Sequence, residues 1–113
     1  MRLLFYLEVI DVNIDTHPRG AELTFRFSGE IDHHGARNAI GEIGGKIEFF
    51  RPHICCIDMK EVTFMDSSGI AVVLCAFNKM RELDGRVQII NTPDQARRVL
   101  DAAGLDRLVT IAV

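Results

Sequence analysis

The 113-residue sequence lacks the features that mark several large classes of protein. Its 13 Lys and Arg residues against 16 Asp and Glu form no basic cluster, so we expect no nucleic-acid partner. The apolar opening, residues 1–10, is too short to cross a membrane and has no small-residue cleavage site, so we expect neither a membrane span nor a signal peptide. Repeats, linkers and low-complexity segments are also missing, and the length predicts a single domain over residues 1–113.

Cysteine is scarce, and its number is odd: the chain has Cys55, Cys56 and Cys75. Cys55 and Cys56 are neighbours in a strand-like segment, so their side chains point to opposite faces and cannot hold one metal ion together. We therefore predict reduced thiols in a cytoplasmic protein, with no disulfide and no metal site.

Among the features that are present, alternating apolar and polar residues predict strands. Residues 9–16 and 21–28 alternate on either side of a turn that contains Pro18 and Gly20, which is typical of an antiparallel hairpin. Residues 53–59 form a nearly continuous apolar run, which favours a central strand covered on both faces. Two further strands are expected at residues 86–91 and 108–113.

Three segments with helical spacing lie between these strands. The first follows Asp32, a candidate N-cap, and the pair Gly44-Gly45 predicts a loose or bent second half. The second covers residues 70–83, with Gly85 expected in the left-handed position that ends a helix. The third is expected to begin at a capping box, with Thr92 as N-cap and Gln95 reaching back to it.

The order of these elements predicts an α/β fold. A mixed β-sheet would carry an N-terminal β-hairpin followed by alternating helices and strands, with parallel neighbours joined by right-handed crossovers. The segments 29–34, 65–68 and 91–92 then leave the carboxyl ends of parallel strands. They should gather at one edge of the sheet, where open α/β folds place their sites.

The candidate site is the segment FMDSSG, residues 64–69, at the start of the second helix. Unpaired N–H groups and the positive end of the helix dipole suit this position to capping, anion binding or chemistry at a hydroxyl. Asp66, Ser67 and Ser68 are all possible helix caps. A serine hydrolase would need a base, for which His33 or His34 is in place, but the G-x-S-x-G elbow is missing.

The residues give weaker support to two other hypotheses, a phosphoacceptor aspartate and a metal site. Asp58 lies in a strand as a receiver-type phosphoacceptor would, but the acidic pair and the lysine expected of that site are missing. Adjacent histidines at a helix start diverge, so His33 and His34 indicate a surface pair rather than a metal site. Glu30 and Asp32 beside them form a solvated acidic rim or a partner contact.

Small apolar residues occupy a helix face where charged residues are usual. These are Ala71, Val72, Cys75 and Ala76, on the side of the second helix away from its main apolar stripe. One interpretation is that another helix or the sheet covers this face, and the other is that a partner docks there beside the serines. The residues leave both open.

Three segments together resemble a known family. The segments GEIDHH (29–34), FMDSSGIAVVL (64–74) and DAAGLDRLV (101–109) are similar to the STAS domain of bacterial anti-sigma-factor antagonists. The likeness is to those of the sporulation sigma-F pathway and spans about residues 9–111. This chain departs from the family in its apolar residues 1–7, its Gly44-Gly45 pair and its short C-terminus at Val113.

The resemblance implies a protein-binding regulator rather than an enzyme. Its serine directly after the aspartate, here Ser67, would be phosphorylated by the partner anti-sigma factor, a GHKL-type serine kinase that binds ATP and Mg²⁺. A PP2C-type phosphatase would remove the phosphate, and the chain itself would hold no cofactor. The unphosphorylated form would bind the anti-sigma factor and release a sigma factor, and phosphorylation would block this partner switching.

The expected partner contacts combine the two motifs and the small helix face. They are Glu30, Asp32, His33, His34, Asp66, Ser68, Gly69, Ala71, Val72 and Cys75. The alternative function is a non-catalytic STAS module that scaffolds a complex or binds a small ligand, with Ser67 only a helix cap.

Overall fold

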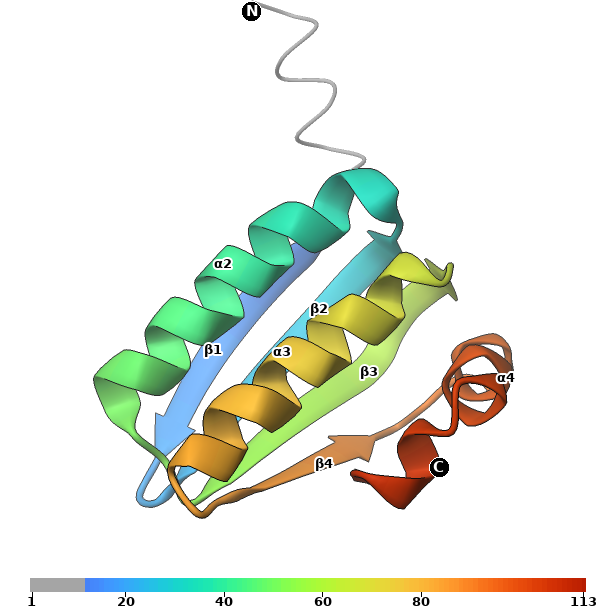
Figure 1. Ribbon diagram of the computed structural model, residues 1–113. Coiled ribbons are helices and arrows are strands. Elements are labelled where there is room, and N and C mark those ends of the chain that lie inside the picture. Colours follow the sequence, from blue (N-terminus) through green and yellow to red (C-terminus); the bar gives the residue numbers. More distant parts are fainter. Residues whose placement is uncertain (1–11) are drawn as a thin grey trace, which may run out of the picture.

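The computed structural model describes residues 12–113, which form a mixed sheet carrying helices (Figure 1). The five strands of this region lie in sequence order across the sheet: β1 (Asn13–Arg19), β2 (Glu22–Ile31), β3 (Ile54–Met65), β4 (Arg86–Ile90) and β5 (Thr110–Ile111). The helices are α2 (His33–Phe50), α3 (Ser68–Glu82), α4 (Asp94–Ala102) and the 3₁₀ turn η1 (Leu105–Arg107). Strand β1 is antiparallel to β2 and all later neighbours are parallel, which confirms the predicted fold class.

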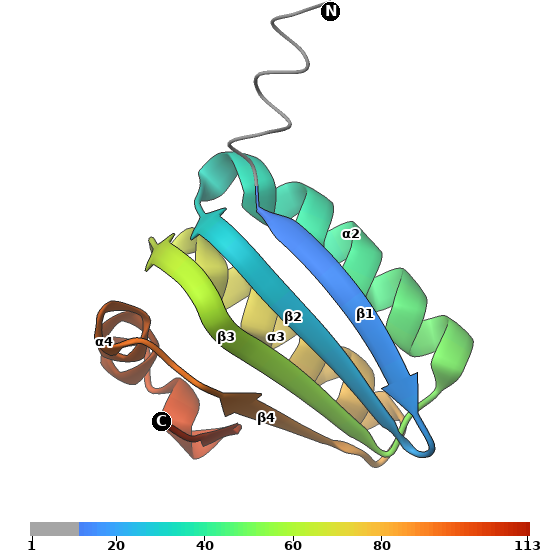
Figure 2. The same cartoon turned by 180° about the vertical axis from the view of Figure 1, so that it is seen from behind.

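Helices α2 and α3 lie side by side on one face of the sheet, and α4 lies at its edge (Figures 1 and 2). The core fills the layer between these two helices and the sheet. Its largest members come from alternate positions of β2 and β3 and from the inner faces of the helices: Leu23, Phe25, Phe27, Ile43, Ile47, Ile57, Met59, Met65 and Met80. Alternation decides which side chains of β2 are buried, whereas residues 55–59 of β3 are all buried, as the nearly continuous apolar run predicts for a central strand.

The hairpin turn is shorter than the sequence pattern predicts. Strand β1 continues through Pro18, which pairs with Leu23, so the turn is only Gly20 and Ala21. Proline is tolerated because β1 is an edge strand, where one backbone N–H per pair of residues points away from the sheet. The expected strand start at residues 9–11 lies outside the described residues.

The prediction that Gly44 and Gly45 loosen α2 is wrong, because the helix is unbroken over 18 residues. A Cβ added at Gly44 would lie 3.6 Å from Cε of Lys79 and 3.8 Å from Sγ of Cys75, both on α3. Packing against α3 thus stabilises the segment that glycine weakens by propensity. The helix ends at Phe50, and Arg51, its C-cap, adopts the left-handed conformation directly before Pro52.

Two helix ends differ from the expected caps. Asp84, rather than Gly85, adopts the left-handed conformation after α3 (φ 55°), and the Gly85 N–H donates to the Met80 carbonyl at 2.8 Å. The expected capping box at α4 is absent, since Pro93 occupies the N-cap position without a side-chain bond. The Thr92 hydroxyl instead donates to the Ala112 carbonyl at 2.8 Å and holds the C-terminal segment. At α4 the side chain expected to cap the helix, that of Thr92, bonds to a distant part of the chain instead.

Asp58 is a buried acid on the face of the sheet opposite α2 and α3. Its Oδ2 lies 3.2 Å from Nε of Arg26, and its Oδ1 accepts from Nδ2 of Asn91 (3.1 Å) and the Lys60 N–H (3.0 Å). Burial raises the pKa of Asp58, but the bonds from Asn91, Lys60 and Arg26 outweigh it and hold the pKa below its ordinary value. The carboxylate is a structural anchor.

Asp58→Asn should therefore cost stability in a pH-dependent way. An aspartate whose folded-state pKa lies below the ordinary 3.8 stabilises the fold at neutral pH and loses this effect as the pH falls through the folded-state pKa. We expect the variant to lose about 1–3 kcal/mol of unfolding free energy at neutral pH, and the difference to shrink below about pH 4. Urea titrations across this range test it, with the exposed Asp101→Asn as control; a pH-independent difference would contradict the assignment.

Candidate functional site

The carboxyl ends of β2 and β3 meet at the edge of the sheet that precedes α2 and α3. Ile31 pairs with Met65, and the Asp66 N–H donates to the Ile31 carbonyl at 3.1 Å. This confirms that the two motifs lie together. Both connections are tighter than expected, because residues 29–31 belong to β2 and residues 64–65 to β3.

The third expected segment, Asn91 and Thr92, does not reach this site. Strand β4 has 5 residues against 12 in β3, and its last residue, Ile90, pairs with Asp58 in the middle of β3. Asn91 consequently bonds to Asp58. The sequence pattern shows that strand ends share an edge but does not show how far each strand extends along it.

Asp66, Ser67 and Ser68 differ in hydrogen bonding and in exposure at the start of α3. Oδ1 of Asp66 accepts from the Ser68 N–H at 2.7 Å. Ser67 directly precedes the helix, is exposed, and makes no capping bond with its side chain. Ser67 occupies the N-cap position of α3, but its side chain does not cap the helix, and its hydroxyl stands at the surface where another protein can reach it. Ser68 is half-buried in the first turn, so the two hydroxyls differ in access.

A residue from α4, Gln95, holds the end of β3, a role that differs from the capping role predicted for it. Oε1 of Gln95 accepts from the Met65 N–H at 2.8 Å, and Nε2 donates to the Met65 carbonyl at 2.7 Å. Gln95 thus takes the place of a neighbouring strand where β4 has already ended. The one signal in the sequence was a glutamine in the first helical turn, which local rules assign to the capping box.

Gly69 is buried, so the prediction that it contacts a partner is wrong. A Cβ at this position would come within 2.4 Å of Cγ and Sδ of Met65. Any larger residue here would force the fully buried Met65 side chain to shift, because the first turn of α3 lies directly against the last side chain of β3. Gly69 therefore positions the serines without touching a partner.

The start of α2 lies beside the serines and forms a groove with α3. Oδ1 of Asp32 accepts from the Gly35 N–H at 3.0 Å, which confirms Asp32 as N-cap, and Glu30, His33 and His34 are exposed. A hollow of about 270 Å³ lies between the two helix starts. Its lining residues are His33, Ala36, Arg37, Ile40, Ser68 and Ala71.

The small face of α3 is covered except at Ala71. Val72 is 2% exposed and Ala76 is fully buried, both within the core, so the prediction that Val72 contacts a partner is wrong. Cys75 is half-buried against α2, where its Sγ lies 3.7 Å from the Ile40 carbonyl. The interpretation that another helix covers this face holds for most of it, and Ala71 alone of the four is exposed.

The three thiols are poorly suited to chemistry at neutral pH. Burial raises the pKa of Cys55 to about 12 and raises the pKa of Cys56 and of Cys75. All three are free cysteines. Among residues 12–113, no group of three or more His, Cys, Asp or Glu side chains is placed to hold a metal ion.

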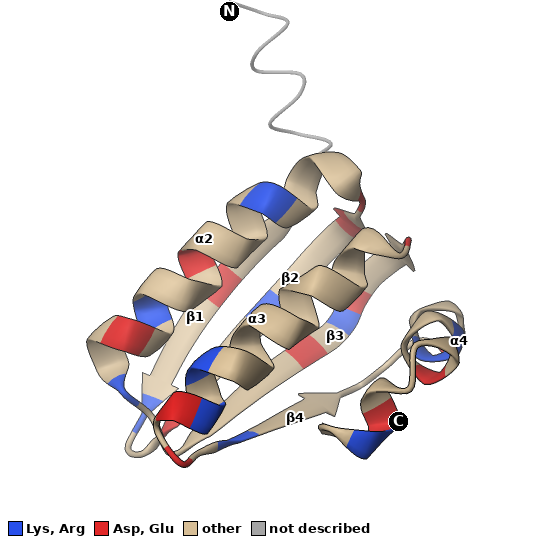
Figure 3. Ribbon diagram, in the orientation of Figure 1, with Lys and Arg blue, Asp and Glu red and all other residues tan. Residues whose placement is uncertain are grey.

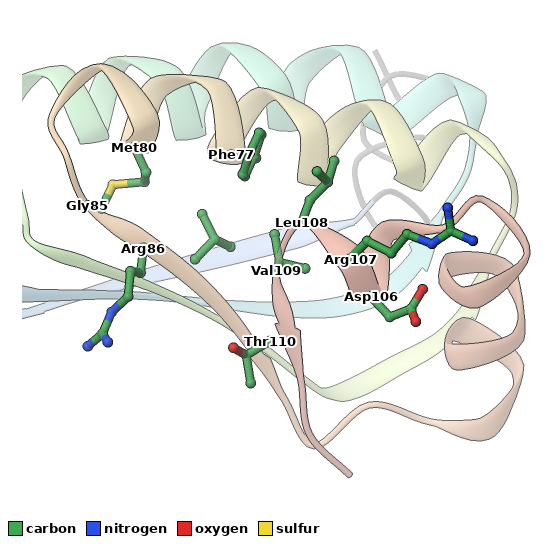
Figure 4. A pocket seen from close by; sticks show the side chains of 10 residues that line it. Phe77, Met80, Gly85, Arg86, Asp106, Arg107, Leu108, Val109 and Thr110 are labelled. Atoms are coloured by element: carbon green, nitrogen blue, oxygen red, sulfur yellow. The ribbon is translucent and has the colours of Figure 1, made fainter.

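A second hollow, of about 270 Å³, lies near the C-terminal end of α3, at the opposite end of that helix from Ser67 (Figure 4). Phe77, Met80 and Leu108 border it, while the guanidinium groups of Arg86 and Arg107 point away from it (Figure 4). The hollow thus lacks charged groups turned inward to select a polar ligand.

Charge and hydropathy add two constraints on the described part of the chain. Lys and Arg alternate with Asp and Glu along α2 and at the end of α3, without a basic stretch in this view (Figure 3). No helix formed by residues 12–113 is both long and apolar enough to span a membrane.

Comparison with known proteins agrees with this geometry. Residues 11–113 match the family model of the STAS domain. The chain is 30% identical over 95 residues to the anti-sigma F factor antagonist of Paenibacillus polymyxa, covering 84% of this chain and 80% of that protein. It is 24% identical over 106 residues to the anti-sigma-B factor antagonist of Bacillus subtilis (strain 168), covering 91% and 93%.

Solved structures with the same fold include SpoIIAA, an anti-sigma factor antagonist. Its unphosphorylated form superposes with a TM-score of 0.78 at 24% identity, covering 89% of each chain. Its phosphorylated form superposes with a TM-score of 0.70 at 24% identity, covering 89% of this chain and 92% of that one. An anti-sigma factor antagonist from Mycobacterium paratuberculosis gives a TM-score of 0.80 at 22% identity, covering 90% and 86%.

Replacement of Gln95 should loosen the segment that presents Ser67. Gln95→Leu leaves the N–H and carbonyl of Met65 without partners, so we expect a loss of about 1–3 kcal/mol in unfolding free energy. Amide hydrogen exchange should accelerate at Met65 itself. The exposed Arg98→Leu on the same helix is the control, with a change within about 0.5 kcal/mol; unchanged exchange at Met65 in Gln95→Leu would refute the role.

Proposed function

This chain belongs to the STAS domain family, and we propose that it is an anti-anti-sigma factor switched by phosphorylation of Ser67. In this proposal the unphosphorylated protein binds an anti-sigma factor in the cytoplasm and so releases a sigma factor. The names of its relatives support the role. The observation that carries it is the Ser67 hydroxyl, exposed at the helix start and not used as a cap.

The chain would be the acceptor in phosphoryl transfer, and the catalyst would be its partner. Oγ of Ser67 attacks the γ-phosphorus of ATP, the bond to the β,γ-bridging oxygen breaks, and the hydroxyl proton leaves to a base in the complex. ATP and Mg²⁺ are bound by the partner, a serine kinase of the GHKL type, and a PP2C-type phosphatase reverses the reaction. Asp66 keeps the turn rigid through its bond to the Ser68 N–H.

The effect of the phosphate is exerted at the interface and leaves the fold in place. A phosphate carries about −1.5 to −2 charges. Its interaction with the start of α3 is worth about 0.3–2 kcal/mol, whereas driving a two-state element from one form to the other needs roughly 5.5 kcal/mol. Covering a dianion with a partner that offers no cation costs several kcal/mol. Phosphorylation therefore opposes docking rather than refolding the domain.

The docking surface is the rim of the groove between α2 and α3. Ala71 and the half-buried Ile40 give it an apolar floor, and His33 and Arg37 give it a basic side. An element of the anti-sigma factor laid over this groove would also cover Ser67. The alternative, a scaffold or ligand-binding module, assigned Ser67 only the role of a helix cap, and the bond from the Ser68 N–H to Asp66 favours the phosphoacceptor over that role.

The phosphoacceptor can be tested directly. With a cognate anti-sigma kinase and ATP, mass spectrometry should place one phosphate on Ser67, and Ser67→Ala should remove it while Ser68→Ala keeps it. Amide chemical shifts of the phosphorylated protein should change near residues 64–72 and stay constant across the sheet. Phosphate on Ser68, or shifts throughout β1–β5, would contradict the proposal.

The docking surface calls for a separate measurement. Ala71→Arg places a long cation on the exposed floor of the groove, and we expect at least about a tenfold loss of affinity for the anti-sigma factor, equal to about 1.4 kcal/mol. Asn78→Arg, exposed two turns further along α3, is the matched control. Calorimetry would report both; equal effects of the two variants would place the docking surface elsewhere.

A further inference from the structure

Helix α2 lies on one face of the sheet (Figure 1). Its side away from the sheet has a hollow next to an exposed aromatic ring. Gly41 and Gly45 are exposed, and a Cβ at either would meet no atom within 4 Å. One turn further on, Phe49 is 79% exposed and its ring stands edge-on to that of Phe50, with centroids 5.0 Å apart. The hollow measures about 400 Å³.

We propose that this face of α2 binds the same face of a second copy of the chain, in an antiparallel pair around a two-fold axis. A two-fold interface must be complementary to itself, and this helix face meets that condition. The proposal does not depend on the role assigned to Ser67. An exposed phenylalanine beside an open groove is the apolar part of the contact, and burial of Phe49 favours association.

The register follows from the positions of the small residues. An axis beside Ile43 places Gly41 opposite Gly45 of the second copy, and the reverse by symmetry. Because neither glycine carries a side chain, the axes of the two helices can approach to the lower end of the usual range of about 8–10 Å. Phe49 then lies over Asn38 of the second copy, alongside the glycine groove.

The charges on both flanks of the helix favour the same register. Glu42 and Lys46 lie on one flank, and in an antiparallel pair like flanks meet, so each Glu42 faces Lys46 of the second copy. On the other flank Arg37 faces Glu48 of the second copy, where Glu48 also bonds to Lys79 of its own chain. In a parallel pair around a two-fold axis unlike flanks meet instead, so Glu42 would not face Lys46 of the second copy, and this charge pairing belongs to the antiparallel arrangement.

A single helix pair makes a small interface. We expect it to bury less than the roughly 1,200 Å² of total area that is typical of stable complexes, and so to form a weak, concentration-dependent dimer. The pair should therefore be observed as an equilibrium between one and two chains.

A charge exchange tests this arrangement. Sedimentation equilibrium of the full chain should show a mass rising toward two chains as concentration increases toward about 1 mM. Glu42→Lys alone and Lys46→Glu alone should each weaken association at least about tenfold, because like charges then face each other twice. The double variant Glu42→Lys/Lys46→Glu should restore it, and Phe49→Ser should abolish it. Leu108→Ser, an exposed apolar residue outside this face, should leave it unchanged.

Amide chemical shifts locate the contact. On raising the concentration of the wild-type chain, we expect changes confined to residues 34–50. A concentration-independent mass of one chain, shifts centred elsewhere, or a double variant as weak as the single ones would each overturn the proposal.

Discussion

The position of Ser67 depends on the backbone of Met65 being held from both sides. On one side the parallel pairing with β2 extends to Ile31, whose carbonyl also accepts from the Asp66 N–H. On the other side β4 has ended, and the amide of Gln95 takes both hydrogen-bonding groups of Met65. A central strand that continues beyond its neighbour needs such a substitute, because buried backbone groups without partners are costly. The bonds from β2 and Gln95 therefore keep the end of β3 ordered up to the point where the serines follow it.

The acid before the serines then gives them different roles. Asp66 satisfies the Ser68 N–H, so the helix begins without help from Ser67. A hydroxyl that capped the helix would have to break that bond before reacting, whereas the Ser67 hydroxyl is available from the start. Asp66 thus stabilises the start of α3 through the Ser68 N–H, and the hydroxyl of the neighbouring Ser67 is left available for reaction. Gly69 completes the arrangement by letting the first turn of α3 rest on Met65.

The glycines of α2 have two different environments, one packed against α3 and the other open to solvent. Gly44 lies against α3, where Cys75 and Lys79 approach within ordinary contact distance of a Cβ. Gly41 and Gly45 face away from the protein and leave a groove beside Phe49. Helix propensity is lost at all three positions, and the packing of Ile43 and Ile47 into the core supplies the stability that keeps the helix whole.

The sequence alone determined the order of strands and helices, the cap at Asp32, and the meeting of the two motifs at one sheet edge. These features depend on alternation, helical spacing and local hydrogen bonds, which act between residues close in the chain. Only the tertiary structure decided that Val72 and Gly69 are buried, that Thr92 and Gln95 bond across the fold instead of capping α4, and that Ser67 rather than Ser68 is exposed. Each of these depends on which element lies beside a residue and where a neighbouring strand stops. The spacing of residues along the sequence does not specify these tertiary neighbours.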